Sequence, residues 1–444
     1  MINGHLSEPF PLTRSLRQGC PLAPLIFVLQ LEVLLNKIRS LPIIRGLQLH
    51  TGNECKVKVL ADDLFAVCEN SEPALTAMNS VLCEYSTLSE ASVNWCKSTY
   101  LLPAQFELKV EWGMKRVAKG EEERFLGMLI SLQIEASSQG LLLQQRIAAR
   151  LRIWGSAWHL SLIGRALVAN AALFSILWFV TTVIELADGM ARAIRKLVAR
   201  FLWKPRAQST ESFISKVALD TLSFPREKGG LGLVEPTRKN QAQLLIWVKK
   251  AAGLGESEHW VALAERILMG EWKLSRPKDV WACFFMPSFR KKRLCSGFWE
   301  PIRRAWKRMS PNSQSTPTTK EEVLNQLLFE NPVVVDSSHT PFLADGKPGT
   351  FGRATVRRGV VKMEDIWSLP LRGWIPLREL KLKLRGLQRT EEHWHRLIEA
   401  IPLEWLDILG PDGIDPTSTM SQIRNPEEIF SGRYWKSCPA ASGE

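Results

Sequence analysis

The sequence predicts an α+β fold in which a strand-rich amino-terminal part is followed by a mostly α-helical remainder. Apolar side chains recur at three- and four-residue steps in residues 19–41, which is the spacing of an amphipathic helix. Residues 43–67 then carry β-branched runs separated by Gly, Asn and Glu, a composition typical of short strands. From about residue 141 the helical spacing returns in long segments, with arginines around the apolar positions.

The first expected helix begins after Gly-Cys-Pro at 19–21, because proline is favourable near the first position of a helix. Its predicted apolar face consists of Leu22, Leu25, Ile26, Leu29, Val33 and Ile38. A second helix is predicted over 72–89 and a further short strand over 125–131. The glycine-rich stretch 224–236 lacks a phosphate-loop pattern, so it predicts a tight turn packed against helices.

The composition is that of a globular protein with an excess of positive charge. The 444 residues are enough for two or three domains, and a hydrophobic content of 45% allows sizeable cores. Lys and Arg number 58 against 45 Asp and Glu, which gives a formal net charge of +13. This excess favours a polyanionic partner such as nucleic acid. Surplus surface charge on a protein without such a partner would have the same composition, so both interpretations stay open.

Cysteine usage and the apolar segments bear on the compartment. None of the eight cysteines forms a Cys-x-x-Cys pair, and the histidines do not lie at zinc-ligand spacing from them. The first ten residues lack the features of a signal peptide, so an intracellular protein with reduced thiols is expected. Residues 166–184 run without a charge and have the length of a membrane span. A buried helix, interrupted by polar residues such as Asn170 and Thr181, is the alternative.

The stretch "KVLADDLFAV" at 58–67 places Asp62 and Asp63 between two apolar runs. Carboxylates at the tip of a β-hairpin can bind Mg²⁺, which prefers hard oxygen ligands. With a further aspartate nearby they would support two-metal nucleotidyl transfer. An Asp-Asp pair is also common in ordinary polar turns, so the dipeptide alone decides little.

The neighbours of this pair occur in a particular order. They are "RQGCPLAP" at 17–24, "ADD" at 61–63, "NWCKS" at 94–98 and "FLG" at 125–127. The ordered set resembles the palm of reverse transcriptases, specifically those of non-LTR (LINE-type) retrotransposons. Leu60 stands where this family usually has Tyr or Phe. The segment "LSLIGR" at 160–165 and "GGLGL" at 229–233 also resemble the family, the first its thumb segment.

The resemblance implies a function for individual residues. Nucleotide or template binding is expected at Arg17, Gln18 and Gly19, metal binding and catalysis at Asp62 and Asp63, a catalytic role at Lys97, a primer grip at Phe125, Leu126 and Gly127, and contact with the nucleic-acid backbone at Arg146, Arg150 and Arg165. It also implies Mg²⁺, or Mn²⁺ in its place, as the cofactor. The implied partners are an RNA template, a DNA primer and deoxynucleoside triphosphates, in the nucleus or cytoplasm and without a membrane.

The expected organisation follows from the same resemblance. It comprises a partial palm of antiparallel strands and helices at 1–135, a basic thumb-like helical module at 136–205, a helical aromatic and basic region at 206–309, a linker at 310–320 and a region of unknown role at 321–444. The run 166–184 is then a buried thumb helix. In 281–308, aromatic and basic side chains could stack on single-stranded RNA, or long basic side chains could cover a helix face.

One part of the family pattern is missing. The family places another catalytic aspartate on a strand upstream of the RQG segment, but no aspartate precedes Asp62. The fingers, this first palm motif and an endonuclease are therefore expected to be absent, as in an amino-terminally truncated reverse transcriptase. We expect such a polypeptide to be inactive alone. The alternative is a non-catalytic RNA-binding protein derived from such an element.

Overall fold

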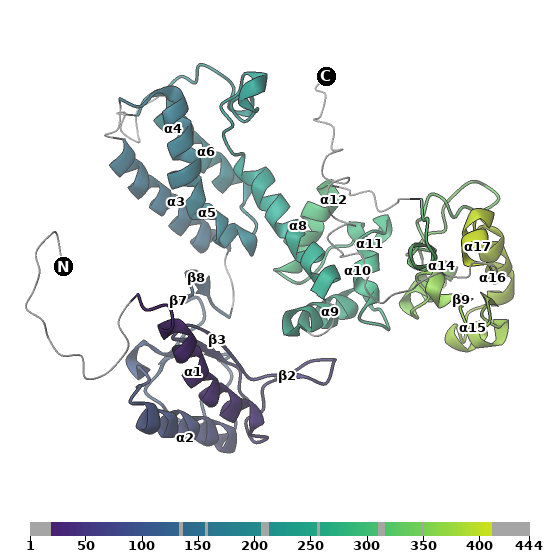
Figure 1. The fold of residues 1–444 in the computed structure, drawn as a ribbon, viewed down its shortest axis with the longest axis horizontal. Helices are drawn as coiled ribbons and strands as arrows, with labels where there is room; N and C mark the ends of the chain where they lie inside the picture. The colour runs from purple at the N-terminus through teal and green to yellow at the C-terminus, as the bar shows by residue number, and fades with distance from the viewer. Residues whose placement is uncertain are drawn as a thin grey trace, which may run out of the picture. The chain divides into compact units, whose positions relative to one another are not determined.

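The computed structural model describes residues 19–132, 136–155, 159–205, 213–254, 258–309, 316–347 and 350–410 (Figure 1). The chain divides into two compact units, Met1–Ile134 and Glu135–Glu444. The mixture of helices with small, mainly antiparallel sheets confirms the predicted α+β class. Among the described residues, no helix combines the length and apolarity that crossing a membrane requires.

Two helices and a small core organise the first unit. Helix α1 spans Ala23–Ser40 and α2 spans Glu72–Ser89, in agreement with the two predicted helices. The core consists of Leu34, Leu35, Ile38, Ile44, Val57, Met78, Val81 and Leu82. Lys56 ties this core to the end of α1, because its buried Nζ donates to the carbonyls of Arg39 and Leu41 at 3.0 and 2.7 Å.

The strands of the first unit form four separate two-stranded ladders. They are β1 (Leu47–Gln48) with β2 (Glu54–Cys55), β3 (Val57–Leu60) with β4 (Asp63–Ala66), β5 (Thr99–Tyr100) with β6 (Lys115–Arg116), and β7 (Glu123–Phe125) with β8 (Met128–Ile130). All are antiparallel except β5–β6. The single strand predicted over 125–131 is wrong in detail, because residues 126 and 127 form the turn between β7 and β8.

The predicted apolar face of α1 is also wrong. Of its six residues only Ile38 is buried, and the other five are exposed. The buried face instead presents Leu34, Leu35 and Ile38 to the core. Apolar residues occupy almost every position from 25 to 29, so the sequence spacing fits more than one face of the helix.

The second unit begins with helices α3 (Ala136–Trp154) and α4 (Leu162–Val168). The expected single helix over 166–184 is not formed. The chain passes through a π-helical segment at Ala169–Phe174, α5 (Ser175–Trp178) and a 3₁₀ turn at Val180–Thr182 before α6 (Asp188–Trp203). This run is not uniformly buried either, since Leu167 and Phe179 are exposed.

Side chains of α8 (Pro236–Leu254) explain where this run ends. Asn240 donates to the carbonyls of Thr181 and Ile184 at 2.7 and 2.9 Å, and accepts from the backbone N–H of Leu186. Farther along α8, the side chains of Gln243 and Trp247 donate to the carbonyls of residues 178 and 182. Backbone groups that an unbroken helix would pair internally are thus satisfied from sixty residues away.

The glycine-rich stretch forms the predicted tight turn. It follows the short helix α7 (Leu219–Leu222) and contains a 3₁₀ turn at Arg226–Lys228. A side chain at Gly230 would lie only 1.9 Å from the carbonyl oxygen of Phe224, so this position excludes any Cβ. Asn170, in the π-helical segment, holds the next residues: it donates to Gly232 and accepts from Val234 at 2.9 and 3.0 Å.

The remaining elements are short helices and one small ladder. They are α9 (His259–Trp272), α10 (Asp279–Cys283), α11 (Pro287–Lys291), α12 (Trp299–Met309), α13 (Lys320–Leu324), α14 (Phe351–Arg357), β9 (Trp367–Ser368), β10 (Gly373–Trp374), α15 (Leu377–Lys383), α16 (Thr390–Glu399) and α17 (Leu403–Leu409). One hydrophobic cluster runs from Leu244 to Leu409 through these elements. Residues on both sides of the predicted linker 310–320 therefore share a core.

Aromatic side chains of region 281–308 belong to this core. Phe284 is fully buried, with ring centroids 5.2 Å from Trp272 and 5.8 Å from Trp306, and Phe289 and Trp299 are buried with it. Rings in such positions are not accessible to nucleic-acid bases. The burial of these four rings of region 281–308 therefore argues against base stacking by them, whereas the alternative that long basic side chains cover a helix face stays a prediction.

A buried charge cluster fixes a loop of the second unit. Arg276 donates to both carboxylate oxygens of Asp365 at 2.5 and 3.0 Å, and to those of Asp279 at 2.9 and 2.8 Å. Asp365 also accepts from the backbone N–H groups of Val361 and Lys362. Burial raises the pKa of Asp279 despite the guanidinium. Burial opposes ionisation at Asp365 too, but there Arg276 and the two backbone donors lower the pKa.

Candidate active site

The two aspartates lie at the tip of the β3–β4 hairpin. Leu60 pairs with Asp63, so Ala61 and Asp62 are the two central residues of the turn. Asp62 and Asp63 are both exposed, as is Leu60, which stands where the family usually has an aromatic residue. Ala61 has φ +52°, the positive value that primed two-residue hairpin turns require of their first central residue. For a residue with a Cβ this conformation costs about 1–2 kcal/mol.

The base of this hairpin is anchored. Val57 is buried in the core of the first unit, and Val59 and Leu64 pack against that core. The alternation of apolar and exposed positions along β3 therefore places the valines inward and leaves the tip in solvent. The apolar residues of 58–67 thus support a hairpin that carries two carboxylates at its tip. No described side chain forms an ion pair or hydrogen bond with either carboxylate.

The β7–β8 hairpin lies beside the carboxylate hairpin. The ring centroids of Phe65 on β4 and Phe125 on β7 are 5.6 Å apart, with an interplanar angle of 49°. Leu126 and Gly127 have φ +48° and +83°, so both central residues of this turn are left-handed, as in a type I′ turn. Glycine adopts this conformation freely, whereas Leu126 holds it under strain. Two of the predicted motifs are therefore brought together through their aromatic residues.

The element containing Lys97 rests on the same core. Trp95, in the 3₁₀ turn Trp95–Lys97, packs against the core of the first unit and edge-to-face on Trp112 at 5.7 Å. The Asn94 side chain caps the turn by accepting from the backbone N–H of Lys97 at 3.2 Å. Lys97 itself is exposed. The Asn-x-x-Lys spacing thus has a local structural reason, and it leaves the lysine ammonium in solvent.

Of the predicted nucleotide-binding residues, Arg17 and Gln18 lie outside the described residues. Gly19 is described and has φ +91°, a conformation that favours glycine, with no atom within 4 Å of the place a Cβ would take. The glycine is therefore required by the turn before α1, and space for a close approach is available beside it.

The predicted backbone-binding arginines lie in the second unit. Arg146 and Arg150 are on α3, half-buried and exposed respectively. Arg165 is on α4 and is half-buried, with a buried Nε that has no hydrogen-bond partner among the described residues. Their contact with nucleic acid stays a prediction.

The capacity of the first unit for metal rests on its oxygen donors. Adjacent, solvent-exposed carboxylates suit Mg²⁺, which is often bound by one or two carboxylates and completes its shell with water and substrate phosphates. Within the described part of the chain, no cluster of three or more His, Cys, Asp or Glu side chains is placed to bind a metal. Asp62 and Asp63 are thus oxygen donors of the kind that Mg²⁺ prefers, and two carboxylates are only part of a two-ion ligand set.

Comparison with known proteins bears directly on this unit. Residues 1–130 match the family described as reverse transcriptase (RNA-dependent DNA polymerase). This part of the chain is therefore similar to reverse transcriptases. The match contains Asp62, Asp63, Lys97 and the Phe-Leu-Gly turn. Reverse transcriptases act on a nucleic-acid template with nucleotide substrates and depend in general on divalent metal ions.

The likeness extends beyond the reverse transcriptase match. The chain is 25% identical over 426 residues to the Transposon TX1 uncharacterized 149 kDa protein of Xenopus laevis. That alignment covers 93% of this chain and 30% of the relative, so the chain spans less than a third of the relative's length. Together the two similarities confirm the predicted relationship to reverse transcriptases of non-LTR retrotransposons.

Two residues that support the reverse transcriptase hairpin were not predicted. Phe65 links the carboxylate hairpin to Phe125, and Lys56 links the start of the hairpin to the end of α1. Phe65 had only a general signal, because an aromatic side chain two positions after the Asp-Asp pair can pack on another aromatic ring. A buried lysine gives no such signal in a single sequence.

Proposed function

We propose that this chain carries part of the active site of an RNA-directed DNA polymerase of the non-LTR type. Asp62 and Asp63 are the metal-binding carboxylates of this site, with Mg²⁺, or Mn²⁺ in its place, as the ion. Support comes from one observation above all: the exposed carboxylate pair lies on a hairpin whose base packs in the core of the first unit, and this hairpin contacts the Phe-Leu-Gly hairpin within the reverse transcriptase match. When bound, the ion would stabilise negative charge on the reacting oxygens.

The chain's own residues have separate roles in this proposal. Lys97, exposed at the end of its capped turn, faces solvent where it can neutralise the phosphates of a deoxynucleoside triphosphate or protonate pyrophosphate. The Phe125–Gly127 turn holds the primer end, and its two left-handed residues present backbone groups at the hairpin tip. Arg17, Gln18 and Gly19 bind nucleotide or template. The partners are therefore an RNA template, a DNA primer and nucleotides.

The ligand set in these 444 residues limits the activity we expect of them. No aspartate precedes Asp62, and the described residues contain no group of three or more His, Cys, Asp or Glu that could hold a metal ion. Two carboxylates alone bind Mg²⁺ weakly and do not fix two ions at the separation that nucleotidyl transfer needs. We therefore propose that the 444-residue polypeptide by itself does not extend a primer.

A primer-extension assay tests this limit. The polypeptide is incubated with an RNA template, an annealed DNA primer, Mg²⁺ and deoxynucleoside triphosphates. We expect no product above the level of the Asp62→Ala variant. Robust extension that Asp62→Ala abolishes would show that these residues hold a complete site.

A non-catalytic role in RNA binding is the second candidate. The observation that favours it is charge: residues 146–206 contain ten Lys or Arg and two acids. A titration of RNA binding at several salt concentrations tests it, because each phosphate contact adds to the slope of affinity against salt. A steep slope supports this candidate, and absence of RNA affinity removes it.

A further inference from the structure

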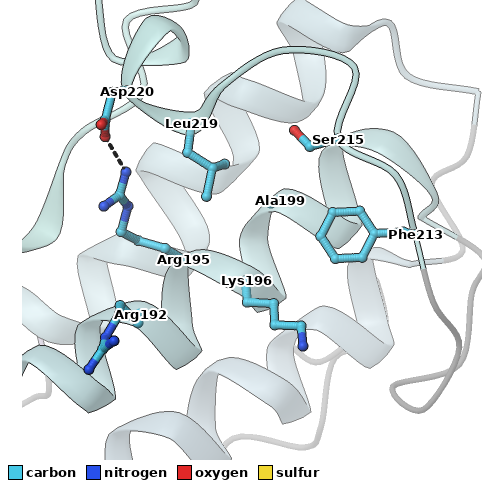
Figure 2. Close-up of a pocket in the computed structure, with 8 residues that line it drawn as sticks. All are labelled: Arg192, Arg195, Lys196, Ala199, Phe213, Ser215, Leu219 and Asp220. Carbon is cyan, nitrogen blue, oxygen red and sulfur yellow. Dashed lines mark hydrogen bonds and ion pairs between the residues drawn. The ribbon is translucent and has the colours of Figure 1, made fainter.

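A cleft on α6 gathers basic side chains outside the reverse transcriptase match. It has a volume of ≈ 260 Å³ and is lined by Arg192, Arg195, Lys196, Phe213 and Asp220, among others (Figure 2). Residues 192, 195, 196 and 199 follow the i, i+3, i+4, i+7 spacing of one helix face. A second hollow shares Arg192 and Arg195 and extends the cleft toward Asp188 and Thr237.

The three cations of this cleft are not equivalent. Arg195 is half-buried and is neutralised by Asp220 at 2.5 Å, with Glu235 at 3.8 Å. Arg192 and Lys196 are exposed, and neither forms an ion pair with a carboxylate of the described residues. Among the described residues, Arg192 donates only to the backbone carbonyl of Asp188, at 3.3 Å. Within that part of the chain, two positive charges one helical turn apart therefore line the cleft without an ion-pair partner.

An aromatic ring completes the lining. Phe213 lies at the end of the cleft opposite Asp220, on the side of Lys196 (Figure 2). The Arg200 guanidinium lies 5.6 Å from its centroid, which holds one face of the ring. Phe213 is half-buried, so part of the ring stays accessible. Unlike the rings of Phe284, Phe289 and Trp299, this one is not enclosed in a core.

We propose that this cleft binds one unpaired nucleotide of a single-stranded nucleic acid. Arg192 and Lys196 contact the phosphate, and the base stacks against Phe213. A cationic groove combined with an aromatic platform is the general chemistry of single-strand binding, because phosphate attracts the cations and every base has a face that can stack. The base of a paired strand is already stacked and hydrogen-bonded, so a duplex would use the two cations alone.

This inference does not depend on catalysis by Asp62 and Asp63; it rests on the RNA-binding candidate, because Arg192 and Lys196 are among the ten basic residues of 146–206. Its ligand chemistry, a phosphate next to a base, occurs in a polynucleotide and in a free nucleotide. The size and openness of a single surface cleft favour a polynucleotide, whose neighbouring phosphates can reach the other basic residues of α6 and α3. We therefore commit to the single strand, and the free nucleotide is a separate arm of the test.

The test measures binding of a labelled 20-nucleotide single-stranded RNA to the full chain by fluorescence anisotropy, at several salt concentrations. The variant R192A/K196A removes both phosphate contacts. The control R378A/R385A removes the same charge from exposed positions on and after α15. We expect the first variant to weaken binding about tenfold at moderate salt and to reduce the salt slope by about 1.4, at 0.7 for each single-strand phosphate contact. The control leaves the slope within error of the unchanged protein.

Phe213→Leu separates a nucleotide site from a merely basic surface. We expect it to weaken single-strand binding about fivefold or more with an unchanged salt slope, since one stacked base is lost and no charge is removed. Binding of a duplex of the same length should not change. Circular dichroism melting checks that each variant is folded.

Several outcomes would overturn the proposal. They are equal effects of R192A/K196A and R378A/R385A, an unchanged single-strand affinity in Phe213→Leu, or equal losses for single strand and duplex in that variant. Competition by a free nucleoside triphosphate at concentrations near the Kd of the RNA would also contradict it, because the ligand would then be a nucleotide and not a strand. Failure of primer extension would change none of these binding results, because they do not depend on catalysis.

Discussion

Phe65 and Phe125 lie 5.6 Å apart between ring centroids and join the hairpin of Asp62 and Asp63 to the Phe-Leu-Gly hairpin. These residues are sixty positions apart in the sequence, yet they set the relation between two motifs of the reverse transcriptase region. The separation lies within the range of about 4.5–7 Å at which aromatic rings interact, and the rings are tilted by 49°. The contact therefore gives a physical reason for an aromatic residue on each of the two hairpins.

A double-mutant cycle tests the energy of this pair. We expect Phe65→Leu and Phe125→Leu to couple by about 0.5–1.5 kcal/mol, the range for aromatic pairs beyond their buried area. The measurement is hydrogen exchange of peptides covering the two hairpins in the full chain. A control cycle combines Phe65→Leu with Phe106→Leu, whose exposed ring is not in contact with Phe65. Coupling of equal size in both cycles would contradict the assignment.

Strain at the carboxylate hairpin can be measured by replacing alanine with glycine. Ala61 has positive φ and an exposed side chain, so Ala61→Gly removes a left-handed penalty of about 1–2 kcal/mol and loses about 0.5–1 kcal/mol of chain entropy. We expect an unchanged or slightly more stable hairpin by hydrogen exchange. Ala66→Gly, at an exposed position on β4 without positive φ, should destabilise it by about 0.5–1 kcal/mol. Equal destabilisation by both changes would mean that Ala61 carries no strain.

Gly359 is expected to be indispensable for the buried charge cluster of the second unit. It has φ +79°, and a Cβ there would lie 2.7 Å from Nε of Arg276. Gly359→Ala should therefore cost about 3 kcal/mol or more, because it adds to backbone strain the displacement of a half-buried guanidinium that pairs with two buried carboxylates. Gly386→Ala is the matched control: φ is +85° but no atom lies within 4 Å, so only about 1–2 kcal/mol of strain is expected. Urea unfolding followed by tryptophan fluorescence gives both values, and similar costs would contradict the clash with Arg276.

The pH dependence of stability should reveal Asp365. The pKa of this carboxyl is lowered, because Arg276 and two backbone donors outweigh the effect of burial. A carboxyl whose pKa is lowered in the folded state stabilises the protein at pH values above its unfolded pKa of about 3.9. This stabilisation is lost as the pH falls through the folded-state pKa. Asp365→Asn should thus cost about 3 kcal/mol at pH 7, and less below pH 3.9. Urea unfolding at pH 7, 5 and 3 measures this difference, and a difference that stays constant with pH would contradict an ionised Asp365.

Local spacing in the sequence predicted several elements closely, including α2 and the start of α1 after Gly-Cys-Pro. This spacing gave wrong predictions where a helix had more than one possible apolar face, or where a distant segment supplied hydrogen-bond partners. Apolar residues crowd the first half of α1, so spacing could not identify Leu34, Leu35 and Ile38 as the buried face. The run 166–184 has no local breaker, and it ends because Asn240, Gln243 and Trp247 capture its carbonyls from a distant helix.

In the candidate site, too, some features were predicted from the sequence and others were not. The order of the motifs predicted that Asp62 and Asp63 form a hairpin tip, and the hairpin is present. The single strand predicted over 125–131 is interrupted by a turn at residues 126 and 127, where Leu126 adopts a positive φ that its side chain does not favour. Only the structure could identify Arg192 and Lys196 as cations without an ion pair among the described residues. The sequence shows ten basic residues in 146–206 but does not indicate which of them have acidic partners.

Metal-directed cleavage of the backbone tests most directly whether Asp62 and Asp63 form a metal site. Iron(II) with ascorbate and peroxide cuts protein backbone next to a bound ion, and Mg²⁺ or Mn²⁺ in excess competes for the same ligands. We expect cleavage within residues 58–67 that Mg²⁺ suppresses, that Asp62→Asn/Asp63→Asn abolishes, and that the control Glu107→Gln/Glu111→Gln retains. Cleavage that persists at this hairpin without the two carboxylates, or absence of cleavage there in the unchanged protein, would contradict the account.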